Sequence, residues 1–321
     1  MTGDRSHSNS GVLSRAQGCL LGQLIGDSLG SLVEFQTPER IHRRYPEGVR
    51  DMADGGTWNT IAGQPTDDSE MALQLARSIV SQGKFDREEV RKAYLFWLDS
   101  DPFDVGGTIL SGLTGRPNPG SQANGAMMRI SPLAIFGANY ALDQVAEWAR
   151  QDAAITHVHR VCQEANALFA MAIAHAVRTG CVADDLYREI AGWAEEMGVD
   201  HRLKETIVAA ADSPPDDFNH QQGWVLIAFR NALWQLLNAE SVEEGIIDTV
   251  MQGGDTDTNA AICGALLGAV YGREAVPNRW IETIQNCRPR AGTQGVHKPR
   301  PEVFWPADVL ELAEQLVSPT D

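Results

Sequence analysis

The segment GCLLGQLIGDSLGSLV, residues 18–33, places a glycine at every fourth position. The same spacing returns near the other end of the chain at Gly264, Gly268 and Gly272. Glycines four residues apart lie on one face of an α-helix, where another backbone can approach closely. A glycine inside a helix costs up to about 1 kcal/mol relative to alanine. The pattern therefore predicts two helices packed tightly at the centre of the molecule, rather than a direct contact with a ligand.

Helical periodicity continues outward from this segment over most of the chain. Apolar residues recur at i, i+3 and i+4, and no segment alternates as a β-strand does. The sequence predicts an all-α fold in one compact domain, residues 12–317, after a polar tail at residues 1–11 that we expect to be disordered. Besides the first helix, helices are expected at residues 69–82, 87–99, 141–150, 161–178, 186–197, 203–211, 223–238, 242–251, 259–271 and 307–317.

Long irregular connections separate several of these helices. Loops rich in glycine and proline are expected at residues 48–64, 100–107 and 114–125, and a ribbon rich in proline and arginine at residues 288–306. Long loops in compact domains are more often functional than idle. We therefore expect the chemistry of this protein to involve loops as well as helix ends.

The composition excludes several classes of partner. The 321 residues include 26 Lys and Arg against 43 Asp and Glu, a formal net charge of −17, which opposes binding to nucleic acid and to anionic membranes. We see no signal peptide and no membrane span, and five scattered cysteines without a CxxC pair argue against disulfides and a thiolate zinc site. A cytoplasmic protein is expected. An anionic substrate would have to be held by metal ions or helix N-termini.

Two acidic motifs lie at predicted helix starts. Each alone fits helix capping, because acidic side chains interact favourably with the N-terminus of a helix. The second also resembles an EF-hand loop, but Ala260 and Leu266 replace the required glycine and glutamate. Together, four carboxylates would repel one another without cations, which favours a site for two Mg²⁺, Mn²⁺ or Ca²⁺ ions. The candidate ligands are Thr66, Asp67 and Asp68 in PTDDSE, and Asp255, Asp257 and Thr258 in GGDTDTN.

Two further carboxylates are candidates for a functional role because of their positions in the sequence. Glu34 lies in an apolar run at the expected end of the first helix, where a buried carboxylate needs a partner or a raised pKa. It fits a structural ion pair or a functional group equally well. Asp104, in DPFDVGGT, fits a loop cap or a functional acid.

The motif NGAMMR, residues 124–129, contains small residues that would leave backbone N–H groups accessible to a phosphate. A simple turn into a helix is the alternative. His157, in THVH, fits a polar contact with substrate or a satisfied structural histidine. Joint metal ligation by His157 and His159 is disfavoured, because residues two apart on a helix point in different directions.

Six motifs, taken in order, resemble those of the ADP-ribosylglycohydrolases, of the type that activates dinitrogenase reductase. The resemblance covers about residues 15–317, and Leu32 departs from it, since many relatives have a proline there. It implies an all-α fold with a binuclear Mg²⁺ or Mn²⁺ centre in a cleft. The motifs are GCLLGQLIGDSLGSLVEF, PTDDSEMAL, NGAMMRISPL, ITHVH, GWVLIAFRNALW and GGDTDTNAAICGALLGA.

The resemblance also implies roles for the candidate residues. The six residues of the two acidic motifs would bind the two metal ions. Glu34 would reach the metal-bound water or the ribose, and Asp104 would act on the distal ribose. Gly125 and Ala126 would bind the pyrophosphate through backbone amides, and Asn124 and His157 would contact the substrate. Trp224 stands where those enzymes carry an adenine-packing aromatic residue, although a core tryptophan is the alternative.

We therefore expect a metal-dependent hydrolase that removes ADP-ribose from modified proteins, with arginine as the leading acceptor and ADP-ribose as the product. Glu34 and Asp104 are the candidate catalytic pair. Hydrolysis of serine-linked, poly- or O-acetyl-ADP-ribose is one alternative. Another is an immunity-type protein that binds an ADP-ribosyltransferase and blocks it. Residues 48–64 and 181–220 are expected to set acceptor specificity.

Overall fold

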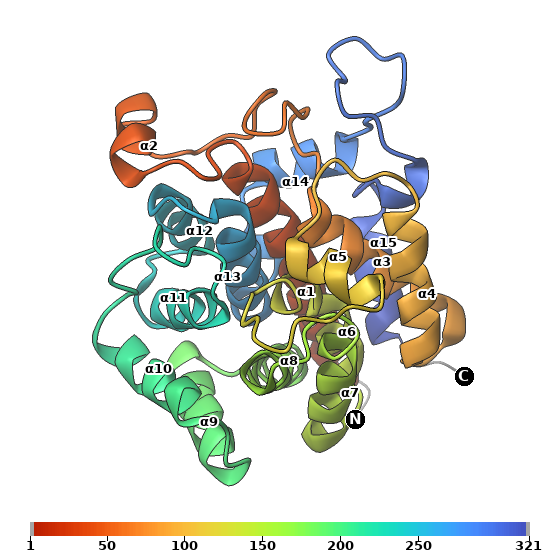
Figure 1. The fold of residues 1–321 in the computed structure, drawn as a ribbon. Coiled ribbons are helices and arrows are strands. Elements are labelled where there is room, and N and C mark those ends of the chain that lie inside the picture. Colours follow the sequence, from red (N-terminus) through yellow and green to blue (C-terminus); the bar gives the residue numbers. More distant parts are fainter. Residues whose placement is uncertain (1–2, 319–321) are drawn as a thin grey trace.

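The computed structural model describes residues 3–318, and Figure 1 shows their path. Within these residues every regular element is a helix, apart from two isolated β-bridges, which confirms the predicted all-α fold. The α-helices are α1 (Gly3–Gly30), α2 (Pro38–Arg44), α3 (Asp67–Gln82), α4 (Arg87–Leu98), α5 (Gly107–Leu113), α6 (Ser131–Gly137), α7 (Leu142–Ala153), α8 (Arg160–Thr179), α9 (Ala183–Glu196), α10 (His201–Asp212), α11 (Val225–Asn238), α12 (Val242–Met251), α13 (Thr256–Tyr271), α14 (Asn278–Asn286) and α15 (Val309–Val317). Three short 3₁₀ helices, η1 (Met127–Arg129), η2 (Arg273–Ala275) and η3 (Glu302–Phe304), complete the set.

Helices α1 and α13 cross at the centre of the molecule, as the glycine pattern predicts (Figure 1). A Cβ placed on Gly18 would lie 2.5 Å from the carbonyl oxygen of Gly268, and one on Gly26 would lie 2.1 Å from that of Ala260. No side chain fits in such gaps, so the two backbones touch. A Cβ placed on Gly30 would lie 2.3 Å from the Cα of Asp257. The contact thus fixes the acidic start of α13 against the end of α1.

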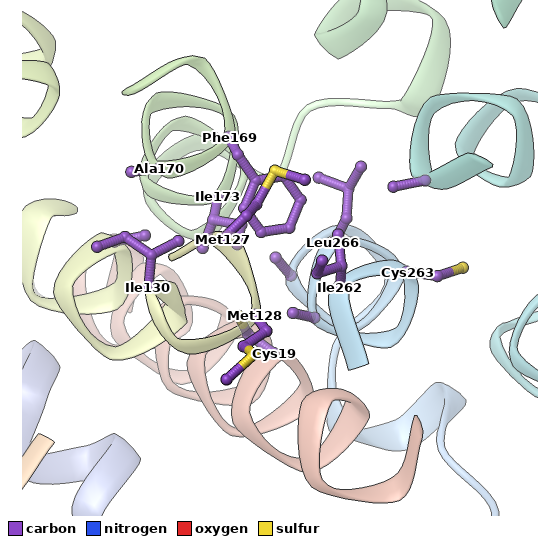
Figure 2. Close-up of a cluster of buried hydrophobic side chains, with 14 of the residues drawn as sticks. Cys19, Met127, Met128, Ile130, Phe169, Ala170, Ile173, Ile262, Cys263 and Leu266 are labelled. Carbon is purple, nitrogen blue, oxygen red and sulfur yellow. The ribbon is translucent and has the colours of Figure 1, made fainter. Parts of the chain in front are cut away.

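The remaining helices surround this pair. In Figure 1, α11 and α12 lie to one side of it and α3 and α5 to the other, while α9 and α10 form a peripheral pair. Figure 2 shows part of the core, where Met127 of η1 lies among Phe169 and Ile173 of α8 and Leu266 of α13. All four side chains are buried. The core therefore extends directly beneath the NGAMMR turn and gives that loop a rigid base.

The sequence predicts a disordered tail at residues 1–11, whereas α1 is assigned from Gly3; Met1 and Thr2 lie outside the described residues. Extending a helix adds one hydrogen bond for each residue fixed, whereas starting one is unfavourable. The packed part of α1 supplies the start, so the polar segment before it continues the helix. The segment's composition, poor in apolar residues, gave no sign of this.

Four helices escaped the sequence prediction: α2, α5, α6 and α14. Each has nine residues or fewer, and all lie beside proline or glycine. Isolated helices of this length are marginal, so tertiary packing rather than local pattern stabilises them. None of the described helices is both long and apolar enough to cross a membrane.

Candidate active site

A cavity of about 270 Å³ opens where the starts of α3 and α13 meet the end of α1. Its walls include six carboxylates from four separate segments and no lysine or arginine. Such a density of negative charge in one cavity is unfavourable without cations. The carboxylates are those of Glu34, Asp67, Asp68, Asp104, Asp255 and Asp257.

Asp27 holds the first acidic motif in place. Its buried carboxylate accepts hydrogen bonds from the backbone N–H of Thr66 at 3.1 Å, the hydroxyl of Thr66 at 2.9 Å and the backbone N–H of Ser69 at 3.1 Å. It therefore caps α3 from another helix. This external cap lets α3 begin at Asp67, two residues before the predicted start, with Asp67 and Asp68 in the first turn.

The second acidic motif follows a tight double-glycine turn. Gly253 and Gly254 have φ angles of 76° and 73°, in the left-handed region that favours glycine. The hydroxyl of Thr256 donates to the carbonyl of Gly30 at 2.7 Å, which ties the start of α13 to the end of α1. The side chain of Asn124 donates to Asp255 at 2.6 Å. The site is thus joined to the NGAMMR turn.

Burial and mutual repulsion raise the pKa values of these carboxyls. Burial is the main cause for Asp67, whose pKa rises to about 6, and for Asp68 and Asp257, whose pKa values rise well above the usual range. The Oδ1 atom of Asp68 is buried without a hydrogen-bond partner. A hard cation would satisfy that oxygen and offset the repulsion. The residues present therefore fit a metal ion.

The tightest group of possible ligand atoms joins Glu34 and Asp104 to Asp257, with all three within 4.8 Å of one another. The expected catalytic pair thus lies beside an expected metal ligand. Glu34 accepts a hydrogen bond from the indole N–H of Trp58 at 2.6 Å, not from a basic residue. Burial, followed by nearby carboxylates, raises the pKa of Glu34 to about 8 and that of Asp104 to about 10.

The expected metal ligands do not all face the cavity. Asp67, Asp68, Asp255, Asp257 and Thr258 line it. Thr66 is fully buried beside them and donates its hydroxyl hydrogen bond to Asp27 or, at 3.2 Å, to Asp68. Its hydroxyl oxygen keeps lone pairs for a cation, so its assignment as a ligand stays a prediction.

Three of the residues expected to bind substrate line the same cavity: Asn124, Gly125 and His157. Ala126 is buried and is not among the residues that line the cavity. The Nε2 atom of His157 has no hydrogen-bond partner, while Nδ1 lies 2.8 Å from the hydroxyl of Thr156. Burial lowers the pKa of His157 to about 3, so the ring is neutral. The THVH motif lies in a loop, not on a helix.

Trp224 lies in an adjoining cavity that shares Ala123, Gln222 and Gly223 with the first. Its side chain is partly exposed, and its indole N–H donates to Gln122 at 3.1 Å. Trp224 thus packs partly against the core and partly borders this adjoining cavity, so its adenine role stays a prediction.

Some residues of the site were not assigned a role from the sequence. Arg129 forms a fully buried ion pair with Asp152 at 3.2 Å, and its Nη1 atom lies 3.5 Å from the carbonyl of Gly125. Trp58 and Phe35 flank Glu34. Arg129, inside the NGAMMR motif, was visible in the sequence, but only the fold shows what it contacts.

The sequence matches the model of the ADP-ribosylglycohydrolase family over residues 8–320. That match spans nearly the whole chain. The chain belongs to the ADP-ribosylglycohydrolase family. Membership and the carboxylate cluster agree with the all-α fold and with a site able to hold metal.

Relatives within the family match most of the chain. The chain is 30% identical over 295 residues to the ADP-ribosyl-[dinitrogen reductase] glycohydrolase of Rhodospirillum rubrum, covering 88% of this chain and 92% of that one. It is 29% identical to the ADP-ribosylarginine hydrolase Tri1 of Pseudomonas putida, covering 95% and 82%. It is 24% identical to human ADP-ribosylhydrolase ARH3, covering 85% and 90%.

A solved structure described as an ADP-ribosylglycohydrolase-related protein complex superposes with a TM-score of 0.78. It is 27% identical, and the match covers 96% of this chain and 98% of that chain. The family and these relatives indicate ADP-ribosylglycohydrolase activity. The alternative of a protein that only blocks a transferase gains no support from the three named relatives, each of which is described as a hydrolase or glycohydrolase.

Proposed function

We propose that this protein hydrolyses ADP-ribosyl-arginine in modified proteins and releases ADP-ribose, with two Mg²⁺ or Mn²⁺ ions bound at the carboxylate cluster. The observation that carries the proposal is the group formed by Glu34, Asp104 and Asp257, whose ligand atoms lie within 4.8 Å of one another. Support for arginine comes from the Pseudomonas putida relative, which is named as an ADP-ribosylarginine hydrolase.

The cations would be held by oxygen atoms of both acidic motifs: Thr66, Asp67, Asp68, Asp255, Asp257 and Thr258. When bound, such ions supply positive charge that orients sugar hydroxyls and makes a bound water more acidic. Their charge also explains how a cavity lined by six carboxylates accepts an anionic substrate.

The reaction breaks the bond between the anomeric carbon of ribose and a guanidine nitrogen, and forms a bond from that carbon to a water oxygen. One water proton must leave, and the departing nitrogen must gain one. Glu34 and Asp104 are the two candidates for these proton transfers, and the N–H of Trp58 orients Glu34. General acid–base catalysis of this kind accelerates reactions about 10²- to 10⁴-fold.

The other lining residues would hold the nucleotide. Gly125 offers its backbone to the pyrophosphate, and neutral His157 presents an unpartnered Nε2 that can donate once Nδ1 accepts from Thr156. Trp224 provides an aromatic face for adenine in the adjoining cavity. Asn124 links this half of the site to Asp255.

The test is a panel of arginine-, serine- and chain-linked ADP-ribose and O-acetyl-ADP-ribose, each assayed with Mg²⁺, with Mn²⁺ and with EDTA. We expect turnover of the arginine-linked substrate to exceed the others and to disappear in EDTA. Preferred turnover of another linkage would replace arginine while keeping the enzyme class. Full turnover in EDTA would remove the metal ions from the proposal.

A further inference from the structure

Three aromatic residues lie next to the carboxylates of the cavity, beside Glu34 and Asp104. Trp58 donates its indole hydrogen bond to Glu34, and Phe103 directly precedes Asp104 in the chain. The rings of Trp58 and Phe103 lie 6.0 Å apart, although they come from two different loops. Each of the two proposed acid–base groups therefore has an aromatic neighbour, and both neighbours are partly exposed to solvent.

Phe35 is the third ring. It follows Glu34, lines the cavity and is 54% exposed. Its φ angle of 63° lies in the left-handed region, which bulky residues rarely occupy. Two hydrogen bonds hold it there: from the N–H of Phe35 to the carbonyl of Gly254 at 2.7 Å, and from the N–H of Gly254 to the carbonyl of Gln36 at 3.0 Å.

Single exposed apolar side chains are common and by themselves need no explanation. Phe35 differs because its backbone is strained and its ring reaches the same cavity as the reacting carboxylates. Strain of this kind persists where the surrounding structure imposes it, and it clusters at functional sites. An aromatic ring that is half exposed beside an acidic cavity adds little to folding, which favours a role in binding.

The chemistry around these rings suits a flat cation. A guanidinium group stacks on aromatic faces while its N–H groups reach carboxylates, and it is more weakly hydrated than an ammonium group. Among the described residues that line the cavity, none is a lysine or an arginine. Phe103 already has one cation near its face, since Nζ of Lys298 lies 6.0 Å from the ring centroid.

We propose that Phe35, Trp58 and Phe103 form an acceptor subsite that binds the guanidinium of the modified arginine, and so select arginine over neutral acceptors. This inference rests on the proposed function and deepens it. A serine acceptor has neither the charge nor the flat surface, and gains nothing from the rings. Trp58 has a second role, because its indole N–H also positions Glu34.

The test compares Phe35→Leu and Phe103→Leu with the unchanged protein, since leucine keeps apolar volume but removes the ring. We expect each change to lower kcat/KM for ADP-ribosyl-arginine about 3- to 30-fold, the range of one cation–π contact, mainly through KM. The Kd for free ADP-ribose, measured by calorimetry, should stay within about twofold, because that ligand lacks the acceptor. Phe96→Leu is the matched control, since Phe96 is also 54% exposed but lies on α4 away from the cavity.

Trp58→Phe separates the two roles of Trp58, which are the ring contact with the acceptor and the hydrogen bond to Glu34. The ring remains, so the preference for arginine over serine linkages should remain, whereas kcat should fall for every linkage because Glu34 loses its donor. A positioning role predicts that kcat per folded molecule falls, with the folded fraction measured by circular dichroism, whereas a loss of folding alone would leave kcat per folded molecule unchanged.

Direct binding of agmatine, a guanidinium without a nucleotide, distinguishes failure of this inference from failure of the proposed function. We expect agmatine to bind the ADP-ribose complex by NMR titration, and more weakly after Phe35→Leu or Phe103→Leu. If arginine-linked substrate is hydrolysed but both leucine variants keep its kcat/KM and agmatine affinity, the subsite is wrong and the function stands. If the substrate is not hydrolysed, the proposed function fails, and the agmatine titration alone decides whether the rings bind guanidinium.

Discussion

Gly22 of α1 and Gly264 of α13 face each other so closely that a Cβ on Gly22 would lie 2.0 Å from the carbonyl oxygen of Gly264. A Cβ on Gly264 would lie 2.1 Å from that of Gly22. The contact is reciprocal and involves backbone on both sides, so no side-chain rotation can relieve it. The start of α13, and with it Asp255 and Asp257, depends on this spacing.

Gly22→Ala should destabilise the fold. Alanine would gain up to about 1 kcal/mol in helix propensity, but overpacking of a core costs about 1–3 kcal/mol and more where backbone must move. Thermal denaturation measures the net effect. Gly192→Ala is the matched control, because Gly192 lies within α9 with nothing within 4 Å of an added Cβ. It should be neutral or stabilising, and an equal loss in both variants would contradict the packing argument.

The cation-free protein should lose stability as pH rises from 7 to 9. The folded pKa values of Glu34 and Asp104 are about 8 and about 10, above their ordinary values of 4.5 and 3.8. At any pH between its ordinary and its folded pKa, each group holds more protons in the folded state than in the unfolded state. Stability therefore falls as pH rises through that window, by at most about 1.4 kcal/mol per pH unit for each group. His157, with its pKa lowered to about 3, has the opposite effect, but only below its ordinary pKa near 6.5.

The measurement is the Tm in EDTA at pH 7, 8 and 9, repeated with Mg²⁺ or Mn²⁺. Ions should raise the Tm most at pH 9, where the carboxyls are ionised. Asp257→Asn should reduce the rise in Tm that the metal ions cause. It should also stabilise the metal-free protein, because it removes one repelling charge. A Tm in EDTA that stays level or rises with pH would contradict the electrostatic account of the cavity.

Asp104→Asn should slow hydrolysis about 100-fold or more and leave the affinity for ADP-ribose largely intact. An amide can still form hydrogen bonds with ribose, but it cannot transfer a proton. Asp101→Asn in the same loop is the control, since Asp101 is exposed and asparagine tolerates its φ of 55°. Normal turnover in Asp104→Asn would leave Glu34 as the sole acid–base candidate.

Trp224→Ala should weaken ADP-ribose binding by about 1–3 kcal/mol, the usual contribution of a base–aromatic stack. Trp224→Tyr should cost much less, since a flat ring remains. Calorimetry gives the affinity and thermal denaturation the stability. Trp97→Ala serves for comparison, because Trp97 is fully buried and its loss should destabilise by about 3–5 kcal/mol. A similar fall in Tm for Trp224→Ala, with unchanged affinity, would refute the adenine assignment.

Asp152→Ala should destabilise the protein by about 3–5 kcal/mol, because it leaves Arg129 charged and unpaired in the core. Tyr94 would also lose the acceptor of its hydroxyl, at 2.7 Å. Denaturant unfolding measures the loss. Glu89→Ala, which breaks the exposed pair with Lys92, should cost less than about 1 kcal/mol. Comparable losses in the two variants would mean that burial does not govern these pairs.

The site was only partly predictable from the sequence. The two acidic motifs and Asp104 could be predicted from their composition and from their position before a helix or a glycine pair. The function of Asp27 could not be predicted, since it accepts hydrogen bonds from Thr66 and Ser69, about forty positions away, and these contacts exist only in the folded chain. Ala126 was expected at the phosphate site, and its side chain is buried, so the role of its backbone N–H stays a prediction.

The sequence by itself determined the helical class, the glycine-lined crossing of α1 and α13, and the two acidic helix starts, because periodicity and helix-start chemistry are local properties of a chain. Only the tertiary structure decided which carboxylates are neighbours, grouping Glu34 and Asp104 with Asp257. It also placed Trp58 on Glu34 and Phe35 in the lining of the cavity. Such pairings join segments far apart in sequence, and they arise from how the helices pack, which no local pattern specifies.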